Sequence, residues 1–445
     1  REVLDRSSAG IAALDDRPRV QIALLSTVSN SYRSLGELDK AAAAASLGAA
    51  KTAAFFGADS YEAVSARTLL GTVRLEQNRL PEAEEIARST LKWLQEHPSH
   101  PQATEVEVAK ANAELARIHF ESGRLQDALP LARRSFTELT RLRGPAFPAT
   151  MQAGDVLSTI LSQNGEFAEA ERIVRLNLAA RESVYGKESL TAAYTMTTLA
   201  NALQKQGKND EAIALLRRIL AIRRAALASD HPRLHLSMMN LGIALVGAGR
   251  QAEALPVLRE GFEANKARLG EGHPRTLSAM GNLAYCLEDL GGPEQLQEAE
   301  KLFRRSVQLG REQLAVQGQT ADSNDFCIRL NNLGALLLKA GKLEEADAVF
   351  AETIAKAADR LPSDHYYTAI FKSNRGRALS RLERFAEAEP LLLESHEVIQ
   401  KQFGADHPRT HRSAWRIAEM YAARHMTDDA DQWRRRFPQG YRDDR

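Results

Sequence analysis

The chain has 445 residues, of which 44% are hydrophobic and 26% are charged. Its 59 Lys and Arg residues nearly balance 58 Asp and Glu residues, so it lacks the basic excess that nucleic acid or an anionic membrane would attract. Only two cysteines occur, Cys286 and Cys327, which is too few for a disulfide framework or a cysteine zinc site. No apolar run is long enough to span a bilayer, so we expect no direct membrane insertion.

We predict an N-terminal capping helix over residues 1–16, with an apolar face made of Val3, Leu4, Ile11 and Leu14. The sequence begins without an initiator Met or a signal peptide, and we interpret it as a fragment or a trimmed form of a longer protein. We expect a cytoplasmic protein. A periplasmic one is the alternative if a missing upstream transmembrane segment tethers the chain.

Residues 17–437 repeat themselves. The clearest copy places His231-Pro232-Arg233 over His273-Pro274-Arg275, 42 residues later. One alanine, here called the marker alanine, recurs in every unit: Ala41, Ala83, Ala128, Ala170, Ala212, Ala254, Ala299, Ala346, Ala388 and Ala430. A period of roughly 20 to 50 residues is typical of proteins whose units stack on their neighbours. We therefore predict a solenoid of ten units, followed by a polar tail at 438–445.

Each unit has two apolar segments of helical period joined by a turn. Five residues before the marker alanine lies a glycine that can adopt the positive φ of a helix end, namely Gly36, Gly123, Gly165, Gly207, Gly249 and Gly341. Three units carry Asn78, Glu383 and His425 there instead. In the seventh unit three extra residues follow Gly291, which predicts a longer turn. The marker alanine falls in the first turn of the second helix, where a larger side chain would separate the two helices.

Charged residues recur around the marker alanine. The residue before it is acidic in nine of ten units, which suits the positive end of a helix dipole. Five residues after it, arginine recurs in six consecutive units: Arg88, Arg133, Arg175, Arg217, Arg259 and Arg304. We interpret this ladder as a solvated outer face, with a ligand track as the alternative. The linkers repeat a His-Pro pair, in which Pro suits the first helical position and the residue before it can cap the helix: His100-Pro101, His231-Pro232, His273-Pro274 and His407-Pro408.

Two motifs could indicate chemistry. Residues 241–252 contain a G-x-G-x-x-A pattern after an apolar run, as in dinucleotide-binding folds, but the equivalent segment 42 residues later has no such glycines. The pairs His231/His235 and His407/His411 could begin a zinc site, yet no third ligand recurs beside both, so capped turns are favoured. No catalytic motif is present in the sequence. We expect no enzymatic activity, no cofactor and no metal.

The unit resembles the tetratricopeptide repeat. Leu241-Gly242 lies on its first helix and Ala254 on its second, and the 42-residue length with the linker Leu269-Gly270…His273-Pro274 is similar to the kinesin-light-chain type. The resemblance covers nearly the whole chain and implies an all-α, right-handed superhelical solenoid of about ten helix-turn-helix repeats. The opening also resembles the segment that begins the repeat region of many bacterial serine/threonine kinases, through Val3-Leu4-Asp5-Arg6 and Tyr32-x-x-Leu35-Gly36.

The same resemblance suggests where a ligand binds. An asparagine lies nine residues before the turn position in four units, at Asn240, Asn282, Asn332 and Asn374; the turn positions are Gly249, Gly291, Gly341 and Glu383. At this place such proteins hold the backbone of a peptide in a concave groove. An amide offers one acceptor oxygen and two donors, which suits an extended chain. The alternative is a hydrogen bond between stacked helices. Tyr285 and Asn331 complete the predicted peptide-binding residues in the middle of the chain.

The last units carry arginines at related positions. Arg416 of the tenth repeat occupies the position that Asn374 has in the ninth repeat. Arg412 lies one helical turn before Arg416, and Arg377 follows Asn374 by three residues. This arrangement resembles the carboxylate clamp of chaperone-binding tetratricopeptide proteins. The clamp is incomplete, because Ala335 stands where it has another Asn and Asn331 stands where it has a base. We predict a preference for acidic residues or a C-terminal carboxylate; alternatively, the arginines are neutralised by Glu419, Glu383 or Asp428.

These patterns predict a non-catalytic scaffold that binds an extended peptide or a partner domain, and no nucleic acid. The alternative is the sensor or regulatory arm of a larger signalling enzyme, a serine/threonine kinase or signalling ATPase, whose catalytic domain is absent from this chain. An enzyme with a site inside the superhelix is disfavoured, since no nucleophile–base or metal constellation occurs in the sequence.

Overall fold

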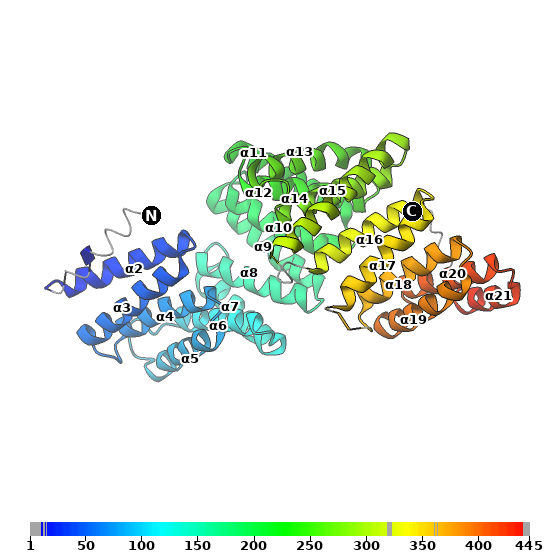
Figure 1. The fold of residues 1–445 in the computed structure, drawn as a ribbon. Coiled ribbons are helices and arrows are strands. Elements are labelled where there is room, and N and C mark those ends of the chain that lie inside the picture. The colour runs from blue at the N-terminus through cyan, green and yellow to red at the C-terminus, as the bar shows by residue number, and fades with distance from the viewer. Residues whose placement is uncertain are drawn as a thin grey trace. The chain divides into compact units, whose positions relative to one another are not determined.

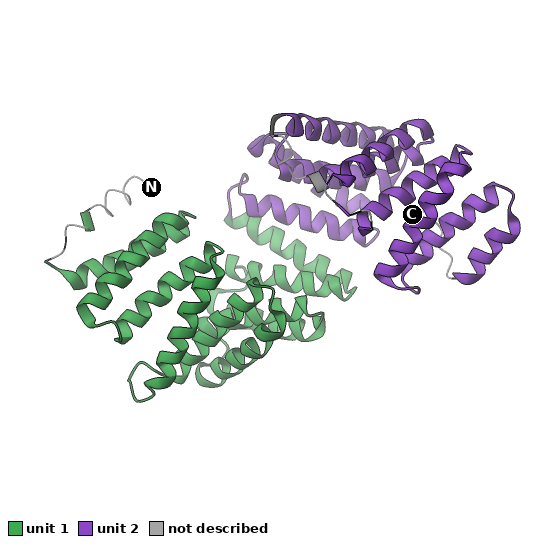
Figure 2. Cartoon of the chain, turned by 60° about the horizontal axis from the view of Figure 1, so that its bottom comes forward, with its two compact units in different colours: residues 1–226 green, residues 227–445 purple. Residues whose placement is uncertain are grey.

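The computed structural model describes residues 10, 11, 14, 16–317, 323–359, 361–362 and 364–438. Within these ranges the chain forms twenty α-helices and no strand, which confirms the all-α prediction (Figure 1). The chain divides into two larger compact units that each contain five of the repeats (Figure 2). They are Arg1–Ala226 and Leu227–Arg445, called unit 1 and unit 2 from here on, and the boundary falls between two helix pairs. Most of the predicted capping helix lies outside the described residues, as does the tail from residue 439 onward.

In unit 1 the first helices of the five pairs are α2 (Pro18–Ser34), α4 (Tyr61–Glu76), α6 (Glu105–Glu121), α8 (Pro148–Gln163) and α10 (Leu190–Lys205). The second helices are α3 (Leu38–Phe56), α5 (Leu80–Glu96), α7 (Leu125–Arg143), α9 (Phe167–Tyr185) and α11 (Asn209–Ala226). Within the unit, each helix packs on its neighbours in the chain. At the N-terminal end, buried Ile11 joins a core cluster with Leu25 and Val28 of α2.

In unit 2 the first helices are α12 (Pro232–Gly247), α14 (Pro274–Leu290), α16 (Ser323–Lys339), α18 (Tyr366–Arg381) and α20 (Pro408–Ala423). The second helices are α13 (Gln251–Leu269), α15 (Pro293–Gln317), α17 (Leu343–Ala358), α19 (Phe385–Phe403) and α21 (Thr427–Arg436). The same serial packing holds here. The run at 241–252, which resembles a nucleotide-binding motif in sequence, is the end of α12, a turn and the start of α13, so it is part of a repeat.

Close helix contact explains the small residues of the repeat. All ten marker alanines have an exposed fraction of 0%. Several first helices carry a matching glycine, and at Gly334 an added Cβ would lie 2.7 Å from the Phe350 ring. At Gly376 it would lie 2.7 Å from Leu392. The repeat therefore requires small side chains on both helices of a pair, because an apolar side chain of the second helix packs directly against the backbone of the first helix.

The turns follow the prediction in all but one respect. The six predicted glycines have positive φ, and the three replacements share this conformation, with φ of 60° at Asn78, 59° at Glu383 and 62° at His425. The prediction of a longer turn after Gly291 is wrong. Helix α15 begins at Pro293, six residues before its marker alanine, whereas α13 begins three residues before its own. The extra residues extend the helix, because Pro293 is suited to a first helical position.

The His-Pro linkers start three first helices as predicted. Helices α12, α14 and α20 begin at the proline, and the preceding histidine accepts a hydrogen bond from the backbone N–H two residues later, at 3.1, 3.1 and 3.2 Å for His231, His273 and His407. The fourth linker differs. Helix α6 begins at Glu105, four residues after Pro101, and Thr104 caps it. Threonine is a preferred capping residue, so it sets the start of that helix.

The arginine ladder joins one repeat to the next. Arg175 donates to Glu211 at 2.7 Å, Arg259 to Glu298 at 2.6 Å, and Arg304 to Glu345 at 2.6 Å. Each glutamate is the acidic residue that precedes the next marker alanine. The arginines are partly exposed, but the interpretation as a purely solvated face is incomplete, since their charges pair with the adjacent repeat.

Candidate functional site

Three positions of each first helix share one face, which we call the first-helix face. They lie 13, nine and six residues before the turn position, a spacing that keeps side chains on one side of a helix. In unit 1 this face borders a hollow of about 570 Å³. Eight of its lining residues occupy these three positions. Those 13 residues before the turn position are Lys110, Gln152 and Tyr194, those nine residues before it are Glu114 and Val156, and those six residues before it are Thr72, Arg117 and Thr159.

The charged groups beside this hollow are compensated by neighbours. Arg33 donates to Glu76 through two nitrogens, at 2.9 and 2.6 Å. These hydrogen bonds lower the pKa of Glu76 and raise the pKa of Arg33. Asp155 accepts two hydrogen bonds from Arg181, at 2.9 and 2.6 Å. The hollow therefore offers a mixed surface with no large excess of either charge.

The predicted asparagines occupy the same register in unit 2, and we call them the asparagine column. Asn240, Asn282 and Asn332 are half-buried on α12, α14 and α16. Across the described ranges, their side-chain amides make no hydrogen bond to another protein group. The corresponding positions in unit 1 are Thr27, Leu69, Glu114, Val156 and Thr198, so the asparagine column belongs to unit 2 alone.

Asn374 differs from the other three members of the column. Its Nδ2 donates to Oδ1 of Asn331 at 2.8 Å, and its Oδ1 accepts from Arg416 at 2.9 Å. Arg416 also donates to Ser373 at 3.0 Å. These contacts link α16, α18 and α20, which is the inter-helix role weighed as the alternative. An amide has a second donor hydrogen and a second lone pair, so Asn374 retains capacity for a ligand.

The remaining predicted basic residues lie on the same side of the last repeats. Arg377 and Arg412 are half-buried on α18 and α20. Arg412 and Arg416 are four residues apart and share a helix face. The structure therefore brings Asn331, Asn374 and Arg416 into direct contact and places the other two arginines on the flanking positions of the same surface.

Sequence reasoning named Tyr285 on this face but missed its other apolar members. Leu236 and Ile243 of α12 have exposed fractions of 55% and 47%, and Tyr285 of α14 has one of 54%. All three lie 13 or six residues before their turn positions. A concentration of large exposed apolar side chains on one face is typical of an interaction surface. The register of the asparagines was the signal that could have located Leu236 and Ile243.

The first histidine of each pair caps a first helix. Nε2 of buried His235 lies 3.0 Å from the backbone oxygen of Ser229, while His231 caps α12. Among the described residues, no group of three or more His, Cys, Asp or Glu side chains is placed to hold a metal ion. Within the same part of the chain, every helix is too short or too polar to cross a bilayer.

Stacked helix pairs with a small residue at each crossing define a helical repeat protein. Family models described as tetratricopeptide repeat match residues 150–225, 191–267 and 367–436, residues 328–367, residues 239–313 and residues 64–89. These stretches together cover more than half of the chain, which belongs to the tetratricopeptide repeat family. The predicted family is thereby confirmed. No curated protein matches the chain at a significant level.

The chain is similar to several solved structures. The apo form of RapI has a TM-score of 0.62 at 12% identity, and the match covers 84% of this chain and 96% of that one. Aspartyl phosphate phosphatase F from Bacillus subtilis has a TM-score of 0.53 at 12% identity, with 85% and 94% covered. A Podospora anserina protein described as a kinesin light chain has a TM-score of 0.44 at 23% identity, with 48% and 98% covered. At these identities the likeness concerns the fold alone.

Proposed function

We propose that the first-helix face of unit 2 binds an extended segment of a partner protein, and that the chain acts as a non-catalytic scaffold. The observation that carries this proposal is the asparagine column, three of whose amides make no hydrogen bond within the described part of the stack. The donors and the acceptor of a half-buried amide without a protein partner need water or a ligand to satisfy them. An extended backbone has unpaired N–H and C=O groups at regular spacing and meets this requirement.

The surroundings of the column suggest what the segment contains. Leu236, Ile243 and Tyr285 favour apolar side chains opposite α12 and α14. Arg377 and Arg412 favour a carboxylate opposite α18 and α20, either from an acidic residue or from a chain end. The same binding face would serve a free scaffold or the regulatory arm of a larger enzyme, so the proposal covers both.

The test compares asparagines that differ in their contacts. The probe is a 12-residue peptide obtained by display selection on the wild-type chain. Asn282→Ala and Asn332→Ala should each weaken its binding by about 0.5–1.5 kcal/mol, or roughly two- to tenfold, without changing the melting temperature. Asn374→Ala is the control, and it should lower the melting temperature because it breaks the bonds to Asn331 and Arg416. If Asn282→Ala lowers the melting temperature while affinity holds, the column is structural.

A further inference from the structure

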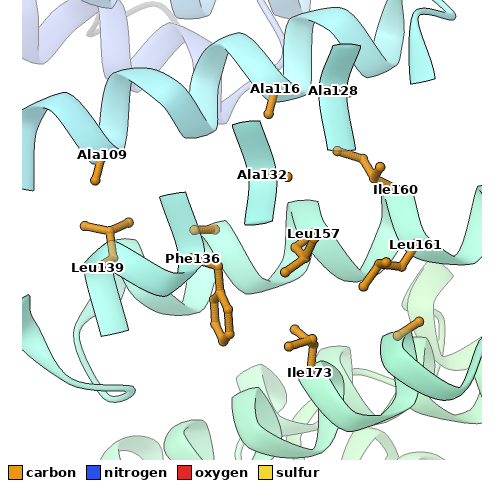
Figure 3. Packing of buried hydrophobic residues seen from close by; sticks show 12 residues of the cluster. Ala109, Ala116, Ala128, Ala132, Phe136, Leu139, Leu157, Ile160, Leu161 and Ile173 are labelled. Atoms are coloured by element: carbon orange, nitrogen blue, oxygen red, sulfur yellow. The ribbon is translucent and has the colours of Figure 1, made fainter. Parts of the chain in front are cut away.

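Two second helices of unit 1 border a groove that is separate from the first-helix face, and we call it the outer groove. It lies between α7 and α9 and has a volume of about 540 Å³. Phe136 and Thr137 line it from α7, and Ile173 and Leu176 from α9. Leu157 of α8 also lines it, and the side chains of Phe136, Leu157 and Ile173 approach the same space (Figure 3). The groove is therefore mainly apolar.

Other second helices carry an ion pair at the corresponding position. The residue six positions after the marker alanine pairs with a residue of the preceding repeat in three of them: Arg218 with Glu182 at 3.0 Å, Arg305 with Glu271 at 2.7 Å, and Glu352 with Arg311 at 2.6 Å. On α9 this position is Leu176, whose exposed fraction is 46%. An apolar side chain cannot form such a bridge, and Leu176 instead lines the groove between α7 and α9.

The edges of the groove are basic. Its charged lining residues are three arginines and one glutamate, Arg133, Arg141, Arg172 and Glu169. Arg133 already donates to Glu169, and Arg141 is held by Glu105 and Glu138 at 2.7 Å each. The side chain of Arg172 is 62% exposed, and its ion pair with Glu169 is long, at 3.7 Å. Arg172 is therefore the charge best placed to meet a carboxylate of a partner.

We propose that the outer groove binds an amphipathic helix of a partner protein that carries large apolar side chains on one face and a carboxylate at its edge. Exposed residues along α9 follow the spacing of a single helix stripe, at Arg172, Leu176, Ala179 and Ser183. A helix can lay its own ridge of side chains into the space between two such helices. The site belongs to unit 1 and uses no asparagine of the column, so it stands independently of the function proposed for unit 2.

The experiment selects ligands by their dependence on Leu176. A display library of 16-residue helix-forming peptides is selected on the wild-type chain and counter-selected on Leu176→Arg, which places an arginine where α11 has one. The recovered peptides should carry an apolar stripe with an acidic flank. Leu176→Arg should weaken their binding at least tenfold, and Arg172→Glu should weaken it several-fold unless the acidic residue of the peptide is changed to Gln. Leu47→Arg is the matched control, because Leu47 holds the same position on α3 and is 41% exposed.

Several results would overturn the proposal. One is the recovery of no peptide that distinguishes wild type from Leu176→Arg, and another is an equal loss with Leu47→Arg. Loss of binding in Asn282→Ala would place the peptide on unit 2, which contradicts this site and leaves the function of unit 2 intact. Sedimentation that shows a wild-type dimer and a monomeric Leu176→Arg would assign the groove to a second copy of the chain. Equal melting temperatures for all variants exclude unfolding as the cause of any loss.

Discussion

Replacing glycine by alanine should have opposite effects on the stability of the protein at two glycines of unit 2. Gly281 and Gly334 lie in the interiors of α14 and α16. A Cβ added at Gly281 would meet nothing within 4 Å, whereas one added at Gly334 would lie 2.7 Å from Cε1 and 2.9 Å from Cδ1 of Phe350. Phe350 has an exposed fraction of 0%, so its ring cannot move outward into solvent. The two sites therefore separate helix propensity from packing.

Replacing glycine by alanine within a helix contributes about 1 kcal/mol of stability when nothing opposes it. We expect Gly281→Ala to raise the free energy of unfolding by about 0.5–1 kcal/mol. At Gly334 the same gain is opposed by overpacking, which costs about 1–3 kcal/mol, so the net result should be a loss of up to about 2 kcal/mol. Phe350→Leu in the Gly334→Ala background should recover part of this loss, because it removes the ring that the new methyl group meets.

The assay is urea denaturation followed by circular dichroism, with all variants measured in the full chain. Stacked repeats need not unfold in a single step, so the comparison uses the shift of the transition that the variants share. An equal stabilisation by Gly281→Ala and Gly334→Ala would refute the close contact between the helices of a pair.

Three further predictions concern charge. A double-mutant cycle on Arg259 and Glu298, which pair at 2.6 and 2.9 Å, should give a coupling of about 0.2–1 kcal/mol that fades in high salt, and a coupling of zero would remove the inter-repeat role of the ladder. Burial lowers the pKa of His396 to about 4, so the folded state favours the neutral ring. Its contribution to stability should therefore fall by up to about 3 kcal/mol as the pH drops from about 6.5 to 4, and His396→Phe should make the loss of stability over this range smaller than in the wild type. Arg412→Glu should weaken an acidic peptide more than its neutral counterpart, and equal losses would exclude a charge preference.

Local constraints made much of the repeat predictable. The marker alanines and the positive-φ turns recur because each pair of helices meets the same steric limits, and even Glu383 and His425 adopt the conformation usually left to glycine. The seventh turn was misjudged because the extra residues could enter either the turn or the helix, and Pro293 decided in favour of the helix. Sequence spacing alone did not distinguish these outcomes.

Contacts between repeats were harder to predict. The arginine ladder and the acidic residues before the marker alanines were recognised separately, but their pairing depends on how neighbouring repeats stack. For Asn374, the register was predicted while its bonds to Asn331 and Arg416 remained one of two alternatives. The outer groove escaped notice because Leu176 is apolar in a helix where apolar residues are expected, and only comparison with the ion-paired positions of other repeats sets it apart.

The central claim is that the first-helix face of unit 2 is where a partner binds, and site-specific photocrosslinking tests it most directly. A benzophenone amino acid is placed at Tyr285, which is 54% exposed on that face, or at Leu47, which is 41% exposed on a second helix. We predict that the selected 12-residue peptide crosslinks from position 285, that the yield falls in the Asn282→Ala background, and that position 47 gives no product. Equal crosslinking from both positions, or a yield at 285 that Asn282→Ala leaves unchanged, would contradict the account.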